Sequence, residues 1–99
     1  MSNLFEVGVI YYTHPVVVII TGCPRFLEYI EFVLGMHTQG HWGDLSEIGY
    51  VASDKGLIDR TSVLSAYDLV EEFEPLGNAI IIVTDLQLDT TIISMSGEP

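Results

Sequence analysis

The chain has 99 residues, enough for one domain spanning 1–99, and its 48 % hydrophobic content excludes a disordered chain. Fourteen acidic residues against three basic ones give a formal net charge of −11 at pH 7. That charge excludes direct nucleic-acid binding, which needs a basic footprint on phosphates, and it favours partners with basic surfaces.

The most apolar window of the sequence, residues 4–23, does not predict a membrane span. A spanning helix needs about 20 mostly apolar residues, whereas this window contains Glu6, His14 and Pro15 and has no basic flank. The start of the chain also lacks the basic segment of a secretory signal. The sequence therefore predicts a cytoplasmic protein that does not bind membranes.

The N-terminal part of the sequence predicts a strand followed by an apolar segment of undecided structure. Residues 7–12 (VGVIYY) predict a strand, since β-branched and aromatic side chains favour extended backbone. In residues 16–21 (VVVIIT) the β-branched side chains favour a second strand. A short buried helix is the alternative, with Thr13 as its N-cap and Pro15 in its first turn.

Residues 24–36 give the clearest helical pattern in the chain. Pro24 suits a first helical turn, and Gly35 is expected to mark the end of the helix. Residues 46–55 are polar and predict one or two further helical turns. The apolar stripe of the long helix consists of Phe26, Leu27, Ile30, Val33 and Leu34.

The second half of the sequence predicts three strands. Residues 71–78 contain proline, glycine and asparagine and predict a turn. Residues 79–84 form a continuous apolar run, which predicts a central strand covered on both faces. Residues 90–95 predict the last strand. The first of the three, residues 61–69, alternates, and its extended form places on one face Val63, Ser65, Tyr67 and Leu69.

These elements together predict the α+β fold class. Three successive strands with short links form an antiparallel meander. The long helix would cover one face of that sheet. The expected architecture is a small two-layer domain with an N-terminal strand, two helices and a three-strand antiparallel meander packed on the helix.

The segment HTQGHWGDL, residues 37–45, raises the question of a metal site. His37, His41 and Asp44 are residue types that bind zinc. Two glycines in the segment break helical continuity, however, and position 38 is threonine where the H-E-x-x-H motif has glutamate. The sequence therefore predicts no metal ligands and no cofactor.

A structural corner between helix and sheet is the better interpretation of the same segment. Gly40 and Gly43 allow a tight chain reversal, and Asp44 can cap the next short helix or hydrogen-bond its own backbone. Trp42 would anchor the corner in the core with its N–H bonded to a carbonyl, while His37 would be a hydrogen-bonded partner. An exposed tryptophan or histidine that anchors an interface remains an alternative.

Hydroxyl groups near the expected strand ends raise the question of a nucleophile. Ser65 and Tyr67 alternate with apolar residues, and threonines cluster at Thr84, Thr90 and Thr91. A nucleophile needs a base within hydrogen-bond reach, and nothing in the sequence brings a histidine to any of these hydroxyls. We therefore expect ordinary sheet positions, no catalytic residues and no enzymatic activity.

Four segments of the chain resemble a family of small proteins carried by plasmids, prophages and integrative elements. The matching segments are HTQGHWGDL (37–45), SAY (65–67), IIIVTD (80–85) and TTIIS (90–94). They follow the family pattern of a histidine, G-D-W-G-D-L, S-x-Y, an apolar strand ending in I-T, and T-T-x-L. The resemblance covers roughly residues 5–97, and it implies a helix over 15–22 and a mobile-element context.

The sequence departs from that family pattern at three places. His41 stands where aspartate is usual, Ile81 or Ile82 stands where tryptophan is common, and the chain ends in Glu98 and Pro99 without P-E-E-Y. Members are often labelled as parts of restriction–modification systems, but this chain has no glycine-rich cofactor loop after a strand. The resemblance therefore supplies no catalytic residues.

The acidic residues suggest how such a protein would act. Gathered on one face, they would imitate the phosphates of a duplex and occupy a basic nucleic-acid-binding surface. The sequence thus predicts an anti-CRISPR or anti-restriction inhibitor of a host nuclease or CRISPR effector subunit. The candidate partner-binding residues are Asp44, Glu47, Asp54, Asp59, Asp68, Glu71, Glu72, Glu74, Asp85 and Asp89.

A regulatory or adaptor module without DNA mimicry is the alternative function. Such a module would bind another protein of the mobile element through an apolar patch around Trp42, Tyr67 or Phe73. A solvated loop is the simpler interpretation of the glutamates beside Pro75. The sequence leaves open the oligomeric state.

Overall fold

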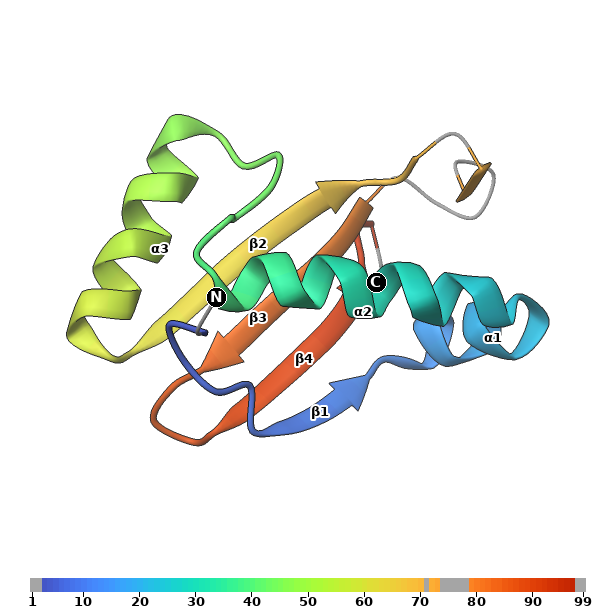
Figure 1. The fold of residues 1–99 in the computed structure, drawn as a ribbon, viewed down its shortest axis with the longest axis horizontal. Coiled ribbons are helices and arrows are strands. Elements are labelled where there is room, and N and C mark those ends of the chain that lie inside the picture. The colour runs from blue at the N-terminus through green and yellow to red at the C-terminus, as the bar shows by residue number, and fades with distance from the viewer. Residues whose placement is uncertain (1–2, 71, 74–78, 98–99) are drawn as a thin grey trace.

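The computed structural model describes residues 3–70, 72–73 and 79–97 and confirms the α+β class (Figure 1). One four-stranded sheet packs with helices in a small two-layer domain. The turn predicted over 71–78 lies outside the described residues, apart from Glu72 and Phe73. The elements are β1 (Val9–Tyr12), α1 (His14–Gly22), α2 (Pro24–Thr38), α3 (Glu47–Asp59), β2 (Ser62–Asp68), β3 (Ala79–Asp85) and β4 (Thr90–Met95).

The strands lie in the order β1-β4-β3-β2. β2 pairs antiparallel with β3, and β3 pairs antiparallel with β4, so the predicted three-strand meander is confirmed. The N-terminal strand β1 joins the same sheet beside β4 and runs parallel to it. The first and last strands of the chain are therefore neighbours, and the intervening helices make the crossover that a parallel pair requires.

The segment left undecided between strand and helix forms the helix α1. Thr13 precedes it as the N-cap residue with extended backbone, and Pro15 occupies its first turn, where a missing N–H costs nothing. Val16 is fully buried within α1. The helix-favouring start of the segment therefore outweighs the strand preference of its β-branched side chains.

The helix α2 continues past Gly35, where the sequence predicted its end. A Cβ added at Gly35 would meet no atom within 4 Å, so this glycine satisfies no close contact there. The helix ends at Thr38, and Gly40 provides the left-handed backbone with φ +80°. Three further residues are thus helical, among them His37 and Thr38, which are both buried.

The helix α3 is longer than the one or two turns predicted, with 13 residues. Ser46 caps it by accepting a hydrogen bond from the Gly49 amide at 3.2 Å. Its apolar periodicity is weak because the contact with the sheet is made by small residues. A Cβ on Gly56 would lie 1.8 Å from the carbonyl oxygen of Ser62, so the glycine allows α3 to lie directly against β2.

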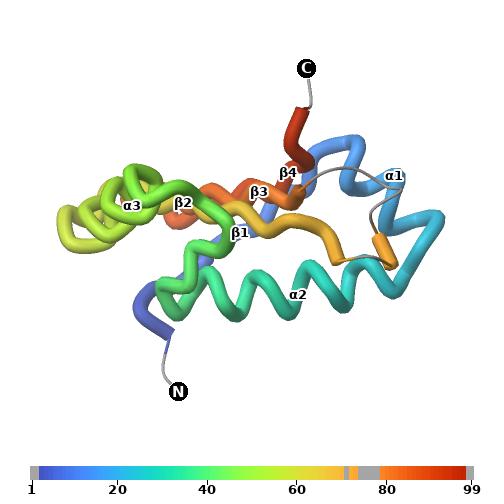
Figure 2. Tube along the Cα trace, turned by 90° about the horizontal axis from the view of Figure 1, so that it is seen from above, coloured from blue at the N-terminus to red at the C-terminus, as the bar shows by residue number. Residues whose placement is uncertain are grey.

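One face of the sheet is covered by α2 and the opposite face is partly open, so the prediction that 79–84 would be covered on both faces is wrong at Val83. Figure 2 shows α2 on one side of the sheet, with α3 beside β2 at its edge. Ile80 and Ile82 of β3 are fully buried toward α2, whereas Val83 is 37 % exposed. The expected one-sided alternation of the first meander strand is confirmed, since its four named residues are all buried.

Two groups of buried side chains form the core. The larger one joins α2 to the sheet through residues such as Phe26, Ile30 and Ile82. The smaller one lies under α3 and contains Phe5, Trp42 and Val63. Within the described parts of the chain, no helix combines the length and apolar content needed to cross a bilayer.

Candidate functional site

The predicted corner segment runs beside β2 as a short extension of the sheet. Gly43 and Ala66 form an isolated parallel bridge. The Asp44 amide donates to the Ala66 carbonyl at 2.7 Å, and the Ala66 amide donates to the Trp42 carbonyl at 3.1 Å. A Cβ on Gly43 would lie 2.1 Å from the Ala66 oxygen, and its φ is +80°, so glycine is needed there.

Two tyrosines hold the backbone of this corner. The Tyr67 hydroxyl donates to the His41 carbonyl, and the Tyr50 hydroxyl donates to the Gly43 carbonyl at 2.9 Å. Burial raises the pKa of Tyr67 to about 12, so this hydroxyl keeps its proton throughout the physiological range. The corner is therefore tied to β2 and α3 through hydrogen bonds from both elements.

The tryptophan of the corner is fully buried and its partner differs from the predicted one. Trp42 Nε1 donates at 2.9 Å to a carboxylate oxygen of Asp54 on α3, where the sequence predicted a backbone carbonyl. The indole stacks near Phe5 and meets the His37 ring edge-on, with ring centroids 6.2 and 5.6 Å apart. Trp42 thus joins three segments of the chain and offers no exposed surface.

Asp44 also differs in role from the expected helix cap. Its Oδ2 accepts a hydrogen bond from the Asp68 amide at 2.8 Å, at the end of β2. Ser46, two residues later, caps α3 instead. Asp44 therefore fixes the end of the first meander strand against the corner.

The structure brings His37 together with three of the hydroxyls that the sequence singled out. His37 Nδ1 lies 2.5 Å from Ser65 Oγ, and Nε2 lies 2.9 Å from Thr84 Oγ1. Thr84 Oγ1 lies 2.7 Å from Thr91 Oγ1, and Thr91 donates to the Val7 carbonyl at 2.8 Å. A single chain of hydrogen bonds thus crosses the core from β2 through α2 to β3, β4 and the segment before β1.

The donors and acceptors of this chain fit an arrangement of protons in which the imidazole is neutral. Because Thr91 gives its proton to the Val7 carbonyl, Thr84 must donate to Thr91. Thr84 then accepts from His37 Nε2–H, and His37 Nδ1 accepts the proton of Ser65. Burial lowers the pKa of His37 to about 4, which favours this neutral imidazole near pH 7.

This geometry is that of a buried structural network. The side chains of His37, Ser65, Thr84 and Thr91 are all fully enclosed, so no substrate carbonyl reaches the serine oxygen. Both imidazole nitrogens of His37 already bind hydroxyls, and His41 is exposed. Among the described residues, no group of three histidine, cysteine, aspartate or glutamate side chains is arranged to hold a metal.

The described acidic candidates mostly follow α3 and the adjacent sheet edge. At the start of α3 lie Asp44, Asp68 and Glu47, the first two joined by a hydrogen bond. Asp54 lies in the middle of α3. At its far end are Asp59, Asp85, which pairs in register with Ser62 at the start of β2, and Asp89 in the following turn. Glu72 lies apart and forms an ion pair with Arg25 at 2.5 Å, while Glu71 and Glu74 fall outside the described residues.

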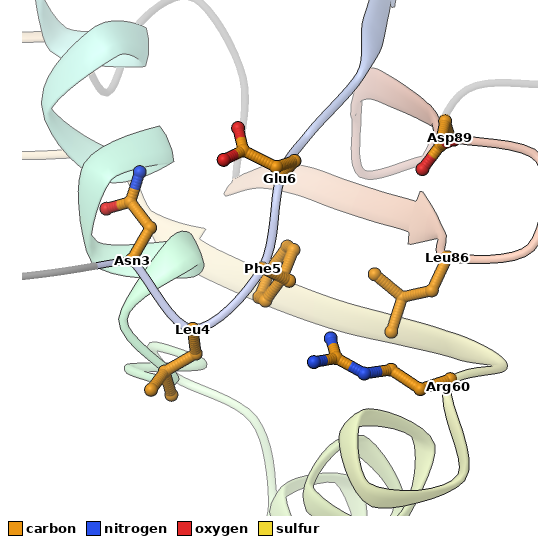
Figure 3. A pocket seen from close by; sticks show the side chains of 7 residues that line it. All are labelled: Asn3, Leu4, Phe5, Glu6, Arg60, Leu86 and Asp89. Carbon is orange, nitrogen blue, oxygen red and sulfur yellow. The ribbon is translucent and has the colours of Figure 1, made fainter.

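A surface cavity of about 480 Å³ opens between the N-terminal segment and the end of α3 (Figure 3). Arg60 lies on one side of it, and Glu6 and Asp89 line other parts of the wall. Arg60 has left-handed backbone with φ 57° because it ends α3. The cavity thus places one of the three basic side chains on the α2 side of the sheet, among acidic residues.

Comparison of the chain with protein-family models, with curated proteins and with solved structures finds no match.

The sequence indicated part of this site and missed other members. It singled out the corner residues and the hydroxyls, but not Phe5, whose ring meets His37 edge-on at 5.2 Å. Phe5 lies at the start of the most apolar window of the sequence, and no motif there indicated its contact with His37. Trp42, Tyr67 and Phe73, around which an exposed apolar patch was expected, are buried, since their side chains are 0, 3 and 5 % exposed.

Proposed function

We propose that the protein is a non-enzymatic inhibitor from a mobile genetic element, acting against a host defence system as an anti-CRISPR or anti-restriction protein. It would occupy the basic nucleic-acid-binding surface of a nuclease or CRISPR effector subunit. The resemblance of residues 37–94 to mobile-element proteins supports this context. Binding without chemistry is supported by the enclosure of the one serine–histidine contact.

The line of acidic residues along α3 and the sheet edge carries the proposal. Seven carboxylates follow α3, whose 13 residues span roughly 20 Å at 1.5 Å per residue. A duplex of that length carries about 12 phosphates over its two strands. One side of it presents roughly half of them, a number similar to the seven carboxylates. Among the described residues, the only ion pair is that of Arg25 with Glu72, away from this acidic edge, and Lys55 and Arg60 offset only two of its seven carboxylates.

Charge-neutral variants of the acidic edge test the proposal. Purified restriction nucleases and CRISPR effectors would be assayed for DNA cleavage with the wild-type protein and with Glu47→Gln/Asp59→Asn. We expect inhibition of the sensitive enzyme to weaken about tenfold in the variant and to fall steeply with salt, because charge pairing drives the encounter.

The matched control carries the same change of charge on the outer side of α2. Glu28→Gln/Glu31→Gln removes two exposed carboxylates away from the edge, and its inhibition should stay within about twofold of wild type. Equal losses in the two variants, or inhibition that is flat from low to high salt, would rule out a specific acidic edge.

A regulatory or adaptor module is the second candidate function. The observation that favours it is the open face of the sheet, where Val83 and Ile92 are 37 and 48 % exposed. This face would be the binding surface of such a module, in place of the patch around Trp42, Tyr67 or Phe73, whose side chains are buried. Such a module would bind its partner equally well at low and high salt, which separates it from the leading proposal.

A further inference from the structure

The face of the sheet opposite α2 carries a row of exposed apolar side chains across all four strands. Tyr11 pairs in register with Ile92, Ile92 with Val83, and Val83 with Leu64. These side chains are 56, 48, 37 and 37 % exposed, respectively. A contiguous apolar row of this kind is unusual on the surface of a protein without a partner.

The surroundings of this row are uncharged at the centre and acidic at two ends. Because side chains alternate along a strand, the row shares its face with Val9, Ile81, Ala66 and Ser94. Among the strand residues that alternate onto this face of the sheet, the only charged ones are Asp68, at the end of β2, and Asp85, at the end of β3. We call this set of strand residues the open sheet face.

The margin of the open sheet face at α3 is hollowed. A cavity of about 190 Å³ lies between α3 and the strands, with Gly49 and Ala52 on one wall and Leu64 and Val83 on the other. The small side chains of α3 leave this space free. It has the size to take one apolar side chain of a partner next to the row.

The outward-facing backbone groups of β2 beside that cavity already have hydrogen-bond partners at Leu64. Ser53 of α3 donates to the Leu64 carbonyl at 2.6 Å and accepts from the Leu64 amide at 3.0 Å. An added strand therefore finds no free backbone groups at this point of β2. A partner of the open sheet face would contact side chains and would not extend the sheet here.

Charge decides which occupant fits. A second copy would bring another chain of net charge −11 against the first, and it would add its own Asp68 and Asp85 to the rim. The three basic side chains do not offset the fourteen acidic ones: Arg25 is paired with Glu72, Arg60 lines the cavity on the α2 side, and Lys55 is a single exposed cation on α3. A surface with an apolar centre and basic margins fits both the row and its rim.

We propose that the open sheet face docks a protein partner that presents apolar side chains flanked by lysine or arginine. The inference rests on the proposed function for the basic character of that partner, and it adds the apolar contact that gives the interaction a fixed position. The acidic edge then attracts the partner, and the row Tyr11–Ile92–Val83–Leu64 seats it.

Selection of peptides from a displayed random library tests the chemistry of this face. Wild-type protein is the bait, and Val83→Thr/Ile92→Thr, which keeps β-branched side chains in the strands, is the counter-bait. We expect peptides that combine leucine or aromatic residues with lysine or arginine, and that bind the variant at least tenfold more weakly. Amide shifts in the wild-type protein should centre on the four residues of the row.

Exposed apolar residues elsewhere provide the matched control. Phe32 on α2 and Ile58 on α3 are 65 and 80 % exposed, and Phe32→Ser/Ile58→Thr should bind the selected peptides within about twofold of wild type. Selected peptides that bind the Val83→Thr/Ile92→Thr variant as well as wild type, or that carry acidic residues, would overturn the proposal.

Two further readouts separate the remaining outcomes. A wild-type dimer at micromolar concentration that Val83→Thr/Ile92→Thr abolishes would assign the face to a second copy and overturn the basic partner. Full inhibition of the nuclease by Val83→Thr/Ile92→Thr would overturn the docking role while leaving the acidic edge intact. Loss of inhibition only in Glu47→Gln/Asp59→Asn would likewise overturn the docking role of the open sheet face and leave the acidic edge intact. The proposed inhibition through the acidic edge and the proposed docking on the open sheet face therefore fail in different experiments.

Discussion

His37 and Ser65 are 28 positions apart in the chain, yet His37 Nδ1 and Ser65 Oγ lie 2.5 Å apart in the core. This hydrogen bond joins α2 to the first strand of the meander, and the opposite ring nitrogen joins α2 to β3. Because every polar atom of the chain from Ser65 to Val7 has a partner, burial of the imidazole carries no unsatisfied group.

Removal of the serine hydroxyl should therefore destabilise the protein. In Ser65→Ala the buried Nδ1 of His37 loses its donor, and we expect the free energy of unfolding to fall by about 1–3 kcal/mol. Urea denaturation followed by circular dichroism measures this change. Ser62→Ala, at an exposed position of the same strand, should change it by less than about 0.5 kcal/mol, and equal effects would show that the hydrogen bond contributes nothing.

Acidification should destabilise the fold through His37. Its pKa is about 4 when folded and about 6.5 when unfolded, so the unfolded chain takes up a proton first as the pH falls. The contribution is complete above pH 6.5 and is lost progressively toward pH 4, with a total of about 3 kcal/mol for a shift of that size.

A comparison with His37→Gln isolates this effect from the acidic residues. Neutralising carboxylates relieves their mutual repulsion in both proteins, whereas only the wild type loses the neutral imidazole. The difference between their unfolding free energies should shrink as the pH falls from 6.5 to 4. A difference that is constant over this window would mean that His37 has an ordinary pKa.

The sequence predicted the first meander strand well because its two-residue alternation matches its burial. The alternation placed Ser65 on the same face as Val63, Tyr67 and Leu69, and that face is buried. The pattern does not say which strands are neighbours, so the parallel pairing of β1 with β4 had no signal. The length of α3 was hidden by Gly49 and Gly56, which serve close packing and suppress helical periodicity.

The site was only partly predictable for a related reason. The motif drew attention to His37 and Trp42, but their partners come from segments 12 to 47 positions away. Such contacts depend on the packing of α2 and α3 against the sheet, which no local pattern encodes. Thr84 appeared as an ordinary threonine at a strand end until the fold placed it beside the imidazole.

Two glycine-to-alanine substitutions should have opposite effects. Gly43→Ala places a Cβ 2.1 Å from the Ala66 carbonyl at a left-handed backbone position, and we expect a loss of more than about 2 kcal/mol. Gly35→Ala, inside α2 with no atom within 4 Å, should gain about 0.5–1 kcal/mol. Thermal unfolding of both variants measures the difference, and similar melting temperatures would contradict the close approach at the corner.

Titration of tyrosine absorbance should show one hydroxyl that ionises late. Burial raises the pKa of Tyr67 from 10.0 to about 12, so the folded protein loses stability as the pH rises from about 10 toward 12. Tyr67→Phe should remove this late step and cost about 1 kcal/mol at neutral pH, because the His41 carbonyl loses its donor. Unchanged titration in Tyr67→Phe would assign the late step to another tyrosine.

The hydrogen bond between Trp42 and Asp54 should be what holds α3 in place over the smaller core cluster. Asp54→Leu leaves the buried indole N–H without an acceptor, whereas Asp54→Asn keeps an oxygen at the same position and removes only the charge. We expect Asp54→Leu to lose about 1–3 kcal/mol and Asp54→Asn less than half of that. The single tryptophan makes this measurable, since its fluorescence should shift to longer wavelength at a lower urea concentration in Asp54→Leu. If both variants lose the same stability, the charge of Asp54 and not its hydrogen bond fixes α3, and the acidic edge then has a structural role as well as a binding one.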